Sequence, residues 1–258
     1  MEPFLATLRE RLAPHGLNLV GTTDVARYDA VVPPRWAVGT RAPHTRTLVV
    51  IGNGGGAFWE AFRRHGERGT SPAGQPDPMD AFTRSVVMDA VATADLDPDG
   101  ALRVAFPFDD RPLALSFMHL AECAGLGRRS LLGILVHPQF GPWMAFRAAL
   151  LLPFALEAPR PADGFDPCPG CADRPCISAC PATAVGPAGW DVPGCIAYRL
   201  SGTGDGCNAG CHARIACVLG PEHRYPPEAL AFHQGHAGAA IQAGDGRSCA
   251  RAPEQKTD

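Results

Sequence analysis

Cysteines are the residues of this chain whose type and spacing are best suited to chemistry. Four of them follow the spacing C-x2-C-x4-C-x3-C and precede a proline; they are Cys168, Cys171, Cys176 and Cys180. The bacterial ferredoxin motif is C-x2-C-x2-C-x3-C-P, in which three cysteines bind one iron–sulfur cluster and the fourth binds another. Short gaps bring three thiolates to neighbouring corners of one small inorganic cube, and the longer middle gap lets the chain loop over it. The motif predicts an iron–sulfur site.

A second and more loosely spaced set of cysteines follows. Its members are Cys195, Cys207, Cys211 and Cys217. Together the two sets supply eight thiolates, which is the number that two [4Fe–4S] clusters require. In two-cluster ferredoxins the ligation is crossed, because the fourth cysteine of each run binds the cluster of the other run. This crossed wiring predicts that the first cluster binds Cys168, Cys171, Cys176 and Cys217. The second cluster is then expected on Cys180, Cys195, Cys207 and Cys211.

Zinc and disulfide bonds are the competing explanations for these sulfurs. Two sites with four thiolates each could bind zinc, although C-x3-C-P is not a zinc-knuckle spacing. Disulfides are less expected because the N-terminus lacks the basic start and apolar run of a secretory signal, which predicts a cytoplasmic protein. Cys123 is expected in the core and Cys249 as a free thiol in a polar tail. Four histidines near the second set are expected as surface residues or hydrogen-bond partners rather than ligands; they are His212, His223, His233 and His236.

The distribution of the cysteines predicts the domain organisation. Residues 1–157 contain Cys123 alone and are expected to form an α/β domain. A proline-rich segment from residue 158 to 167 is typical of a linker or a wrapped loop. Residues 158–225 are expected to form the iron–sulfur domain, and residues 226–258 a C-terminal tail.

Hydrophobic periodicity predicts the elements of the first domain. Apolar residues at helical spacing indicate helices over residues 4–12, 79–94 and 112–124, and β-branched or alternating runs indicate strands over 17–21, 47–51 and 102–106. Residues 144–152 fit either a strand or a buried helix. The segment from Gly52 to Ala57 matches G-x-G-x-x-A, but residues 63–80 provide no second strand with an acidic end. A plain turn is therefore favoured over a glycine-rich loop that lets a flat ligand approach the backbone, and both are favoured over a dinucleotide site.

Composition excludes several classes of protein. The 258 residues are 46% hydrophobic and 19% charged, which indicates a globular chain. The net charge of −3 gives no basic surplus for following a nucleic-acid backbone. Lys256 is the only lysine, which leaves no well-placed Schiff-base or phosphate-binding lysine. The longest apolar stretch is too short to span a membrane.

Several segments together resemble the superfamily of epoxyqueuosine reductases and reductive dehalogenases, cobalamin-dependent enzymes with two ferredoxin-type clusters. The cysteine run ending in Pro181 is similar to the first cluster motif of the family, and Gly-Cys-Ile-Ala-Tyr resembles its Arg-Cys-Ile-Ser-Tyr element. Two further stretches resemble its G…VGITD and AGLG…GLLI-P-x-x-G-P…R…LL motifs. In chain order the four similar regions are residues 16–24, 124–152, 168–181 and 194–198.

This resemblance implies an α+β fold: a flavin-reductase-like α/β domain of the corrinoid-binding type, followed by a ferredoxin-like domain with two [4Fe–4S] clusters. It implies electron transfer from an external donor, of the flavodoxin or ferredoxin type, through the clusters to cobalt. The cobalamin is expected in base-off form without a protein ligand. The residues that match the implied corrinoid pocket are Gly125, Leu126, Gly127, His137, Pro138, Gly141 and Pro142.

The chain also departs from the family pattern. The catalytic aspartate of epoxyqueuosine reductases lies in a D-x-A-P…ER stretch, for which Asp109 or Asp110 is the candidate proton donor here. The alternative for both is a solvated turn before a helix, where acidic residues are favoured. The second cluster motif lacks the C-x2-C-x3-C-P form. The tRNA-binding repeats are expected to be missing, which together with the net charge argues against tRNA as substrate.

The expected function is that of a cytoplasmic oxidoreductase whose two [4Fe–4S] clusters feed a bound corrinoid. The corrinoid would then reduce a small molecule or be reduced itself. One alternative is a ferredoxin-like electron carrier, or a partner of a cobalamin reductase, with no substrate turnover of its own. Another is a zinc-containing interaction module. Nucleic acid and membranes are not expected as partners.

Overall fold

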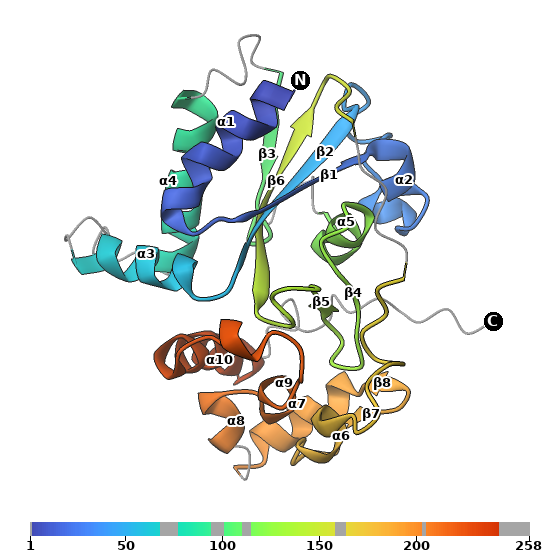
Figure 1. Cartoon of the computed structure of the whole chain (residues 1–258), viewed down its shortest axis with the longest axis vertical. Helices are drawn as coiled ribbons and strands as arrows, with labels where there is room; N and C mark the ends of the chain where they lie inside the picture. The colour runs from blue at the N-terminus through green and yellow to red at the C-terminus, as the bar shows by residue number, and fades with distance from the viewer. Residues whose placement is uncertain are drawn as a thin grey trace. The chain divides into compact units, whose positions relative to one another are not determined.

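The computed structural model describes residues 2–67, 77–93, 101–109, 115–157, 164–202 and 205–242 of the chain. They form a mixed α+β structure (Figure 1). The chain divides into two compact units. The first unit contains residues 1–128 and 143–165, and the second contains residues 129–142 and 166–258. Residues 129–142, expected in the first domain, therefore fall in the second unit.

A four-stranded antiparallel sheet forms the centre of the first unit. Its strands are β1 (Leu19–Asp24), β2 (Thr47–Gly54), β3 (Arg103–Ala105) and β6 (Met144–Leu152), in the order β1-β2-β6-β3. In the register of the two inner strands, Val50 lies opposite Ala149. Every residue of β2 is buried, as expected for a strand that is covered on both faces.

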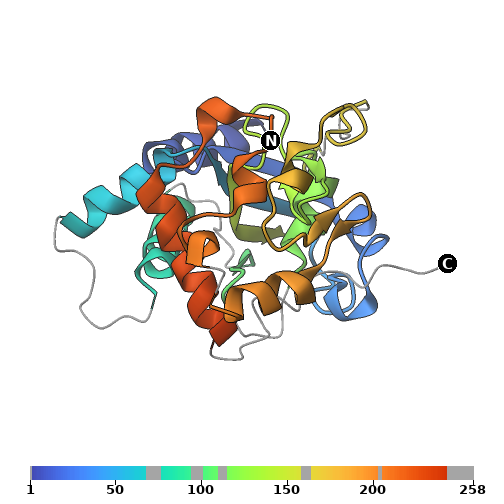
Figure 2. The same cartoon turned by 90° about the horizontal axis from the view of Figure 1, so that it is seen from below.

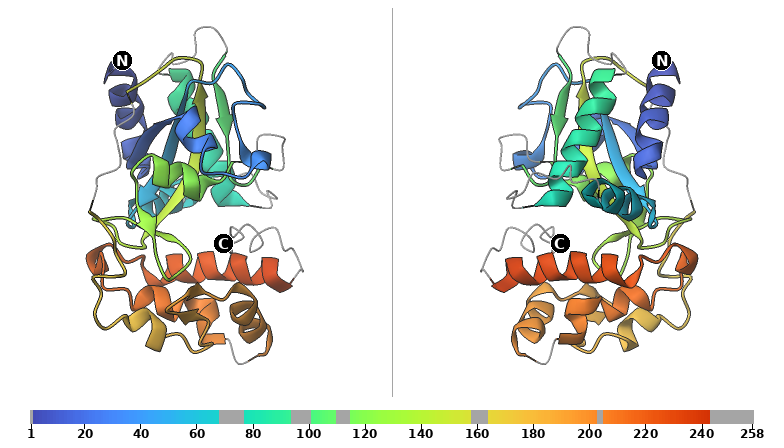
Figure 3. Two further views of the ribbon diagram at one scale, coloured as in Figure 1. Left: turned by 90° about the vertical axis from the view of Figure 1, so that its right-hand side faces the viewer. Right: turned by 90° about the vertical axis from the view of Figure 1, so that its left-hand side faces the viewer.

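Helices cover the two faces of this sheet (Figures 1 and 3). One face carries α1 (Glu2–Leu12), α3 (Ala57–Glu67) and α4 (Pro78–Thr93), and the other carries α2 (Val25–Asp29) and α5 (Phe117–Cys123). Leu8 and Leu12 of α1 are fully buried, so the apolar positions of the predicted helix point into the core. Short 3-10 helices lie at η1 (Ala13–His15) and η2 (Pro34–Trp36).

Each element expected in this unit has a counterpart, but the helix expected over 112–124 begins only at Phe117, since residues 115 and 116 are not helical and residues 112–114 lie outside the described ranges. Residues 144–152 form a strand, which lies between β2 and β3. The expected turn begins later than predicted, because β2 continues through Gly52 to Gly54 and the chain bends at Gly55 and Gly56 before α3. A Cβ at Gly52 would lie 2.6 Å from the carbonyl oxygen of Ala145, so the glycine is needed for the close approach of β6.

The second unit consists of short elements. They are β4 (Arg128–Arg129) at its boundary, β5 (Leu135–Val136), α6 (Pro175–Ser178), β7 (Val185–Gly186), β8 (Gly189–Trp190), α7 (Val192–Leu200), α8 (Asp205–Ala209), α9 (His212–Ile215), η3 (Pro221–His223) and α10 (Pro227–Gln242). Much of the expected C-terminal tail is therefore helical: α10 packs against α8 and α7 and buries Ala229 and Leu230 (Figure 2). None of the helices in the described ranges is both long and apolar enough to cross a membrane.

Candidate metal centres

The first candidate centre is a small cavity in the second unit that four cysteines line. These residues are Cys168, Cys171, Cys176 and Cys217. Cys168 and Cys171 share a turn, in which the backbone N–H of Cys171 donates to the carbonyl oxygen of Cys168 at 3.2 Å. Cys176 lies in α6, and Cys217 follows α9. The cavity thus collects sulfurs from two segments that are more than 40 residues apart in the chain.

The sulfurs of this cavity already receive hydrogen bonds from backbone amides. The N–H of Leu131 donates to Sγ of Cys168 at 3.3 Å. Backbone hydrogen bonds from Leu219 and Val218 act on Cys217. Amide donors of this kind are typical of sites that stabilise negatively charged sulfur.

The second candidate centre is a larger cavity lined by the other four cysteines of the two sets. These are Cys180, Cys195, Cys207 and Cys211, which lie after α6, in α7, in α8 and immediately before α9. Its volume is about 260 Å³, against about 30 Å³ for the first. Gln234, Ala237 and Ile241 of α10 also line it. Sequence analysis missed this contribution, although the Pro226-Pro227-Glu228 start and the alanine-rich run that follows are helix signals.

The pKa values of the thiols show which sulfurs influence one another. Burial raises the pKa of Cys176, and Cys217, Cys168 and Cys171 raise it further. Burial also raises the pKa of Cys207, again with help from Cys211, Cys195 and Cys180. The cysteines that act on each thiol line the same cavity as that thiol. Because thiolates are the ligands, metal binding at either cavity must displace protons.

An apolar core lies between the two groups of sulfurs. Leu132, Val185 and Ala213 are its buried members, and Cys176, Cys180, Cys211 and Cys217 pack against it. Leu132 lines both cavities. The structure therefore divides the eight thiols into the two sets of four expected from the crossed wiring. Their role as cluster ligands stays a prediction.

The spacing of the sulfurs bears on the choice of metal. In the described part of the chain, no three His, Cys, Asp or Glu side chains come together closely enough to hold a metal ion. Four thiolates on one zinc ion all lie about 2.3 Å from a common point. In a [4Fe–4S] cluster each thiolate binds its own iron atom at a separate corner. Both kinds of centre use four thiolates, and metal and sulfide analysis distinguishes them.

The histidines near the second set serve local contacts. Nδ1 of His236 lies 2.9 Å from the carbonyl oxygen of Phe232. His233 packs against the rings of Tyr225 and Phe232. His212 is exposed at the edge of the second cavity. These contacts agree with the expected roles as surface residues and hydrogen-bond partners.

The residues predicted to line a corrinoid pocket fall in both units. Gly125, Leu126 and Gly127 follow α5 in the first unit, whereas His137, Pro138, Gly141 and Pro142 belong to the second. None of them lines either cysteine cavity. Their role stays a prediction.

His137 holds the turn of the second-unit group together. Its Nδ1 accepts the backbone N–H groups of Gln139 at 3.0 Å and Phe140 at 3.3 Å. Burial lowers the pKa of His137, and His223 lowers it further. Both effects favour the neutral ring, whose Nδ1 is free to accept these bonds.

Asp109 lies in a turn after β3, and Arg84 of α4 donates a hydrogen bond to its carboxylate. The Arg84 guanidinium lies 4.3 Å from the ring centre of Phe106 and 5.1 Å from that of Phe108. Asp109 is therefore an ion-paired carboxylate in a turn. Asp110, the other candidate proton donor, is outside the described residues, as is Cys249. No observation tests a catalytic role for either aspartate.

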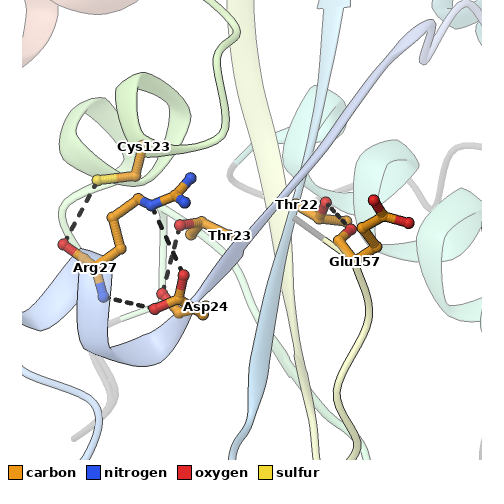
Figure 4. A network of polar contacts seen from close by, with 6 residues as sticks. All are labelled: Thr22, Thr23, Asp24, Arg27, Cys123 and Glu157. Carbon is orange, nitrogen blue, oxygen red and sulfur yellow. Dashed lines mark hydrogen bonds and ion pairs between the residues drawn. The ribbon is translucent and has the colours of Figure 1, made fainter. Parts of the chain in front are cut away.

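Cys123 lies in the core of the first unit, as expected. It is 8% exposed, and burial raises the pKa of its thiol. Its Sγ points to the carbonyl oxygen of Arg27 at 3.9 Å, next to the Asp24 side chain that caps α2 (Figure 4). These contacts occupy the thiol in packing, and Cys123 lines neither of the two cavities.

Comparison with known proteins places the fold. No protein-family model and no curated protein matches the sequence. Among solved structures, a selenomethionine-labelled epoxyqueuosine reductase matches with a TM-score of 0.58 and 16% identity, over 89% of this chain and 71% of that one. Epoxyqueuosine reductase from Streptococcus thermophilus gives 0.56 and 13%, over 88% and 70%.

A third solved structure is a Caenorhabditis elegans B12-trafficking protein, CblC, a homologue of human MMACHC. It matches with a TM-score of 0.54 and 15% identity, over 95% of this chain and 96% of that one. At these identities the likeness is one of fold. The chain therefore has the fold of epoxyqueuosine reductases and of this B12-trafficking protein.

Proposed function

We propose that this protein is a cytoplasmic oxidoreductase that carries two [4Fe–4S] clusters and passes electrons through them to a bound corrinoid. The observation that carries the proposal is the division of eight thiols into two cavities with four cysteines each. Eight thiolates in two sets of four satisfy two clusters without a further ligand. A pair of clusters within one small unit is suited to conducting electrons.

The ligands of the first cluster would be Cys168, Cys171, Cys176 and Cys217, and those of the second Cys180, Cys195, Cys207 and Cys211. The apolar residues between the cavities exclude water, which keeps the clusters intact and influences their potentials. The electrons would come from an external donor of the flavodoxin or ferredoxin type.

The corrinoid is supported by the fold. One solved structure of this fold is a B12-trafficking protein, and the likeness extends over 96% of that chain. A bound corrinoid would supply a redox-active cobalt centre for reduction of a small molecule, or would itself be the molecule reduced. Another solved structure is an epoxyqueuosine reductase with a tRNA stem loop. A net charge of −3 does not favour nucleic acid here.

Metal analysis of anaerobically reconstituted protein tests the clusters. We expect about eight iron and eight acid-labile sulfide per chain, with a rhombic EPR signal on reduction. Cys123→Ala is the matched control, because this cysteine belongs to the first unit and lines neither cavity, and it is expected to keep the full iron content. Stoichiometric zinc without sulfide would contradict the proposal and favour a zinc-binding module.

A further inference from the structure

Arg199 lies at the wall of the second cavity and is held there by neighbouring helices. It belongs to α7. Its Nη2 donates to Oδ1 of Asn208 in α8 at 3.0 Å and to the carbonyl oxygen of Gln234 in α10 at 2.9 Å. Three helices therefore fix the guanidinium beside the sulfurs of this cavity.

One donor of this guanidinium has no acceptor. Nε of Arg199 is buried and has no hydrogen-bond partner among the described residues. An arginine stays protonated in proteins, and a buried N–H without an acceptor costs about 1–3 kcal/mol. Such a group points to an acceptor that the described part of the chain does not provide. Four cysteines also line the cavity that Arg199 lines.

The second set of sulfurs also has a side-chain donor besides Arg199. Burial raises the pKa of Cys195, and a hydrogen bond from the Trp190 side chain and the charge of Arg199 both oppose this shift. Arg199 opposes the shift at Cys207 as well. The other arginine at this cavity, Arg214, directs Nε and Nη2 to the carbonyl oxygen of Pro142 at 3.1 and 2.6 Å.

The first cavity is different in this respect. The hydrogen bonds described for its sulfurs come from backbone amides. Arg174 lines the cavity, but among the described groups that shift the pKa of Cys176 and of Cys217 there is no cation. The charge of Arg199 thus acts on thiols of the second cavity, and its Nε–H lies in the wall of that cavity.

We infer that Arg199 sets the reduction potential of the second cluster, with its Nε–H donating to a sulfur there. The inference rests on the proposed function. On reduction the cluster accepts one electron from the external donor and gains one negative charge, and no bond is formed or broken. A nearby cation and a hydrogen bond to sulfur stabilise the reduced form, so the second cluster has the higher potential. It is therefore the cluster on which the first electron resides.

The test is a redox titration of the reconstituted holoprotein, followed by EPR. The second cluster is identified as the signal that Cys207→Ser removes. In Arg199→Met we expect its equilibrium constant for reduction to fall about tenfold, which is about 59 mV for one electron. The first cluster should keep its potential. Arg199→Lys retains the charge and is expected to restore part of the shift.

A pair of glycines in α10 gives a test that leaves Arg199 in place. A Cβ at Gly238 would lie 3.2 Å from Nη2 of Arg199, whereas a Cβ at Gly235 has no atom within 4 Å. Alanine favours the helix at both positions, so only Gly238→Ala displaces the guanidinium. We expect Gly238→Ala to lower the potential of the second cluster and Gly235→Ala to leave it unchanged. If the Arg199→Met protein does not assemble the second cluster, the comparison of Gly238→Ala with Gly235→Ala tests the role of Arg199 instead.

The outcomes separate the two proposals. Unchanged potentials in fully loaded Arg199→Met, or equal shifts of both clusters, would overturn the role of Arg199 and leave the proposed function in place. If the cluster is lost in Arg199→Met, equal potentials in the two glycine variants would overturn that role. A wild-type protein without clusters would overturn both.

Discussion

Gly141 and Gly220 lie back to back in the second unit. A Cβ at Gly141 would lie 2.0 Å from the carbonyl oxygen of Leu219, and a Cβ at Gly220 would lie 2.5 Å from the carbonyl carbon of Phe140. The φ angles are +57° and +58°, a region that favours glycine. This contact fastens the segment with the expected corrinoid residues directly to the loop that follows Cys217.

Gly141→Ala should therefore destabilise the second unit and impair the first cluster. The alanine would have to displace a backbone carbonyl near Cys217, so we expect a loss of about 2–4 kcal/mol in unfolding free energy. Chemical unfolding and iron content measure the two effects.

Gly202→Ala is the matched control for this variant. Gly202 has a φ of +78° but no atom within 4 Å of a Cβ, so it carries the backbone strain without the collision. Equal losses in the two variants would show that the contact with Leu219 has no special role.

Serine variants of Cys211 and Cys217 test the wiring at two nearby positions. Cys217 lines the cavity of Cys168, whereas Cys211 lines that of Cys180. Cys217→Ser should therefore impair the same cluster as Cys168→Ser, and Cys211→Ser the same cluster as Cys180→Ser. EPR of the reduced variants distinguishes the clusters. The crossed assignment is wrong if Cys168→Ser and Cys180→Ser remove the same signal.

Tyr28 provides a pH-dependent test of the first unit. It is fully buried, its Oη accepts the backbone N–H of Ser116 at 2.8 Å, and burial raises its pKa to about 12. Because the unfolded pKa is about 10, the folded state holds this proton more tightly. Stability from Tyr28 is complete below pH 10 and is lost as the pH rises toward about 12, by about 2–3 kcal/mol.

Tyr28→Phe removes the titrating hydroxyl and with it this loss of stability at high pH. The variant should be less stable at pH 8 by about 1–3 kcal/mol, because the N–H of Ser116 loses its acceptor. The difference from wild type should then narrow at high pH. Urea unfolding at pH 8 and pH 11 measures both. A constant difference between the two proteins would show that Tyr28 does not titrate as described.

His137 gives the opposite dependence on pH. Its pKa is lowered by burial and by His223, so the folded state favours the neutral ring. The stability from His137 is complete above the unfolded pKa of about 6.5 and is lost as the pH falls through the lower folded value. His137→Asn keeps an acceptor for the turn but cannot titrate, and should remove part of the acid destabilisation seen by urea unfolding. An unchanged profile would contradict this account.

Much of the fold could be predicted from local pattern. The β-branched run at residues 47–51 and the apolar spacing in α1 and α4 depend on burial alone, and both appear as expected. Residues 144–152 could not be decided, because a strand covered on both faces has no alternation to distinguish it from a buried helix. The extension of β2 through Gly52 depends on β6, which is distant in sequence.

The grouping of the cysteines could be predicted because cluster chemistry constrains their spacing. The contribution of α10 to the second cavity could not, because it arises from packing on α8. The same holds for Arg199, whose position depends on Asn208 and on a carbonyl oxygen of α10. Neither Asn208 nor Gln234 forms a recognisable sequence motif with Arg199.

The central claim is that the clusters serve a bound corrinoid. An anaerobic titration of the reconstituted protein with cob(II)alamin, followed by EPR and absorbance, tests it most directly. We predict a stoichiometric change to a base-off cobalt spectrum beside reducible iron–sulfur signals. An unchanged cobalamin spectrum in protein with intact clusters would contradict the account. The ferredoxin-like electron carrier would then be the remaining interpretation.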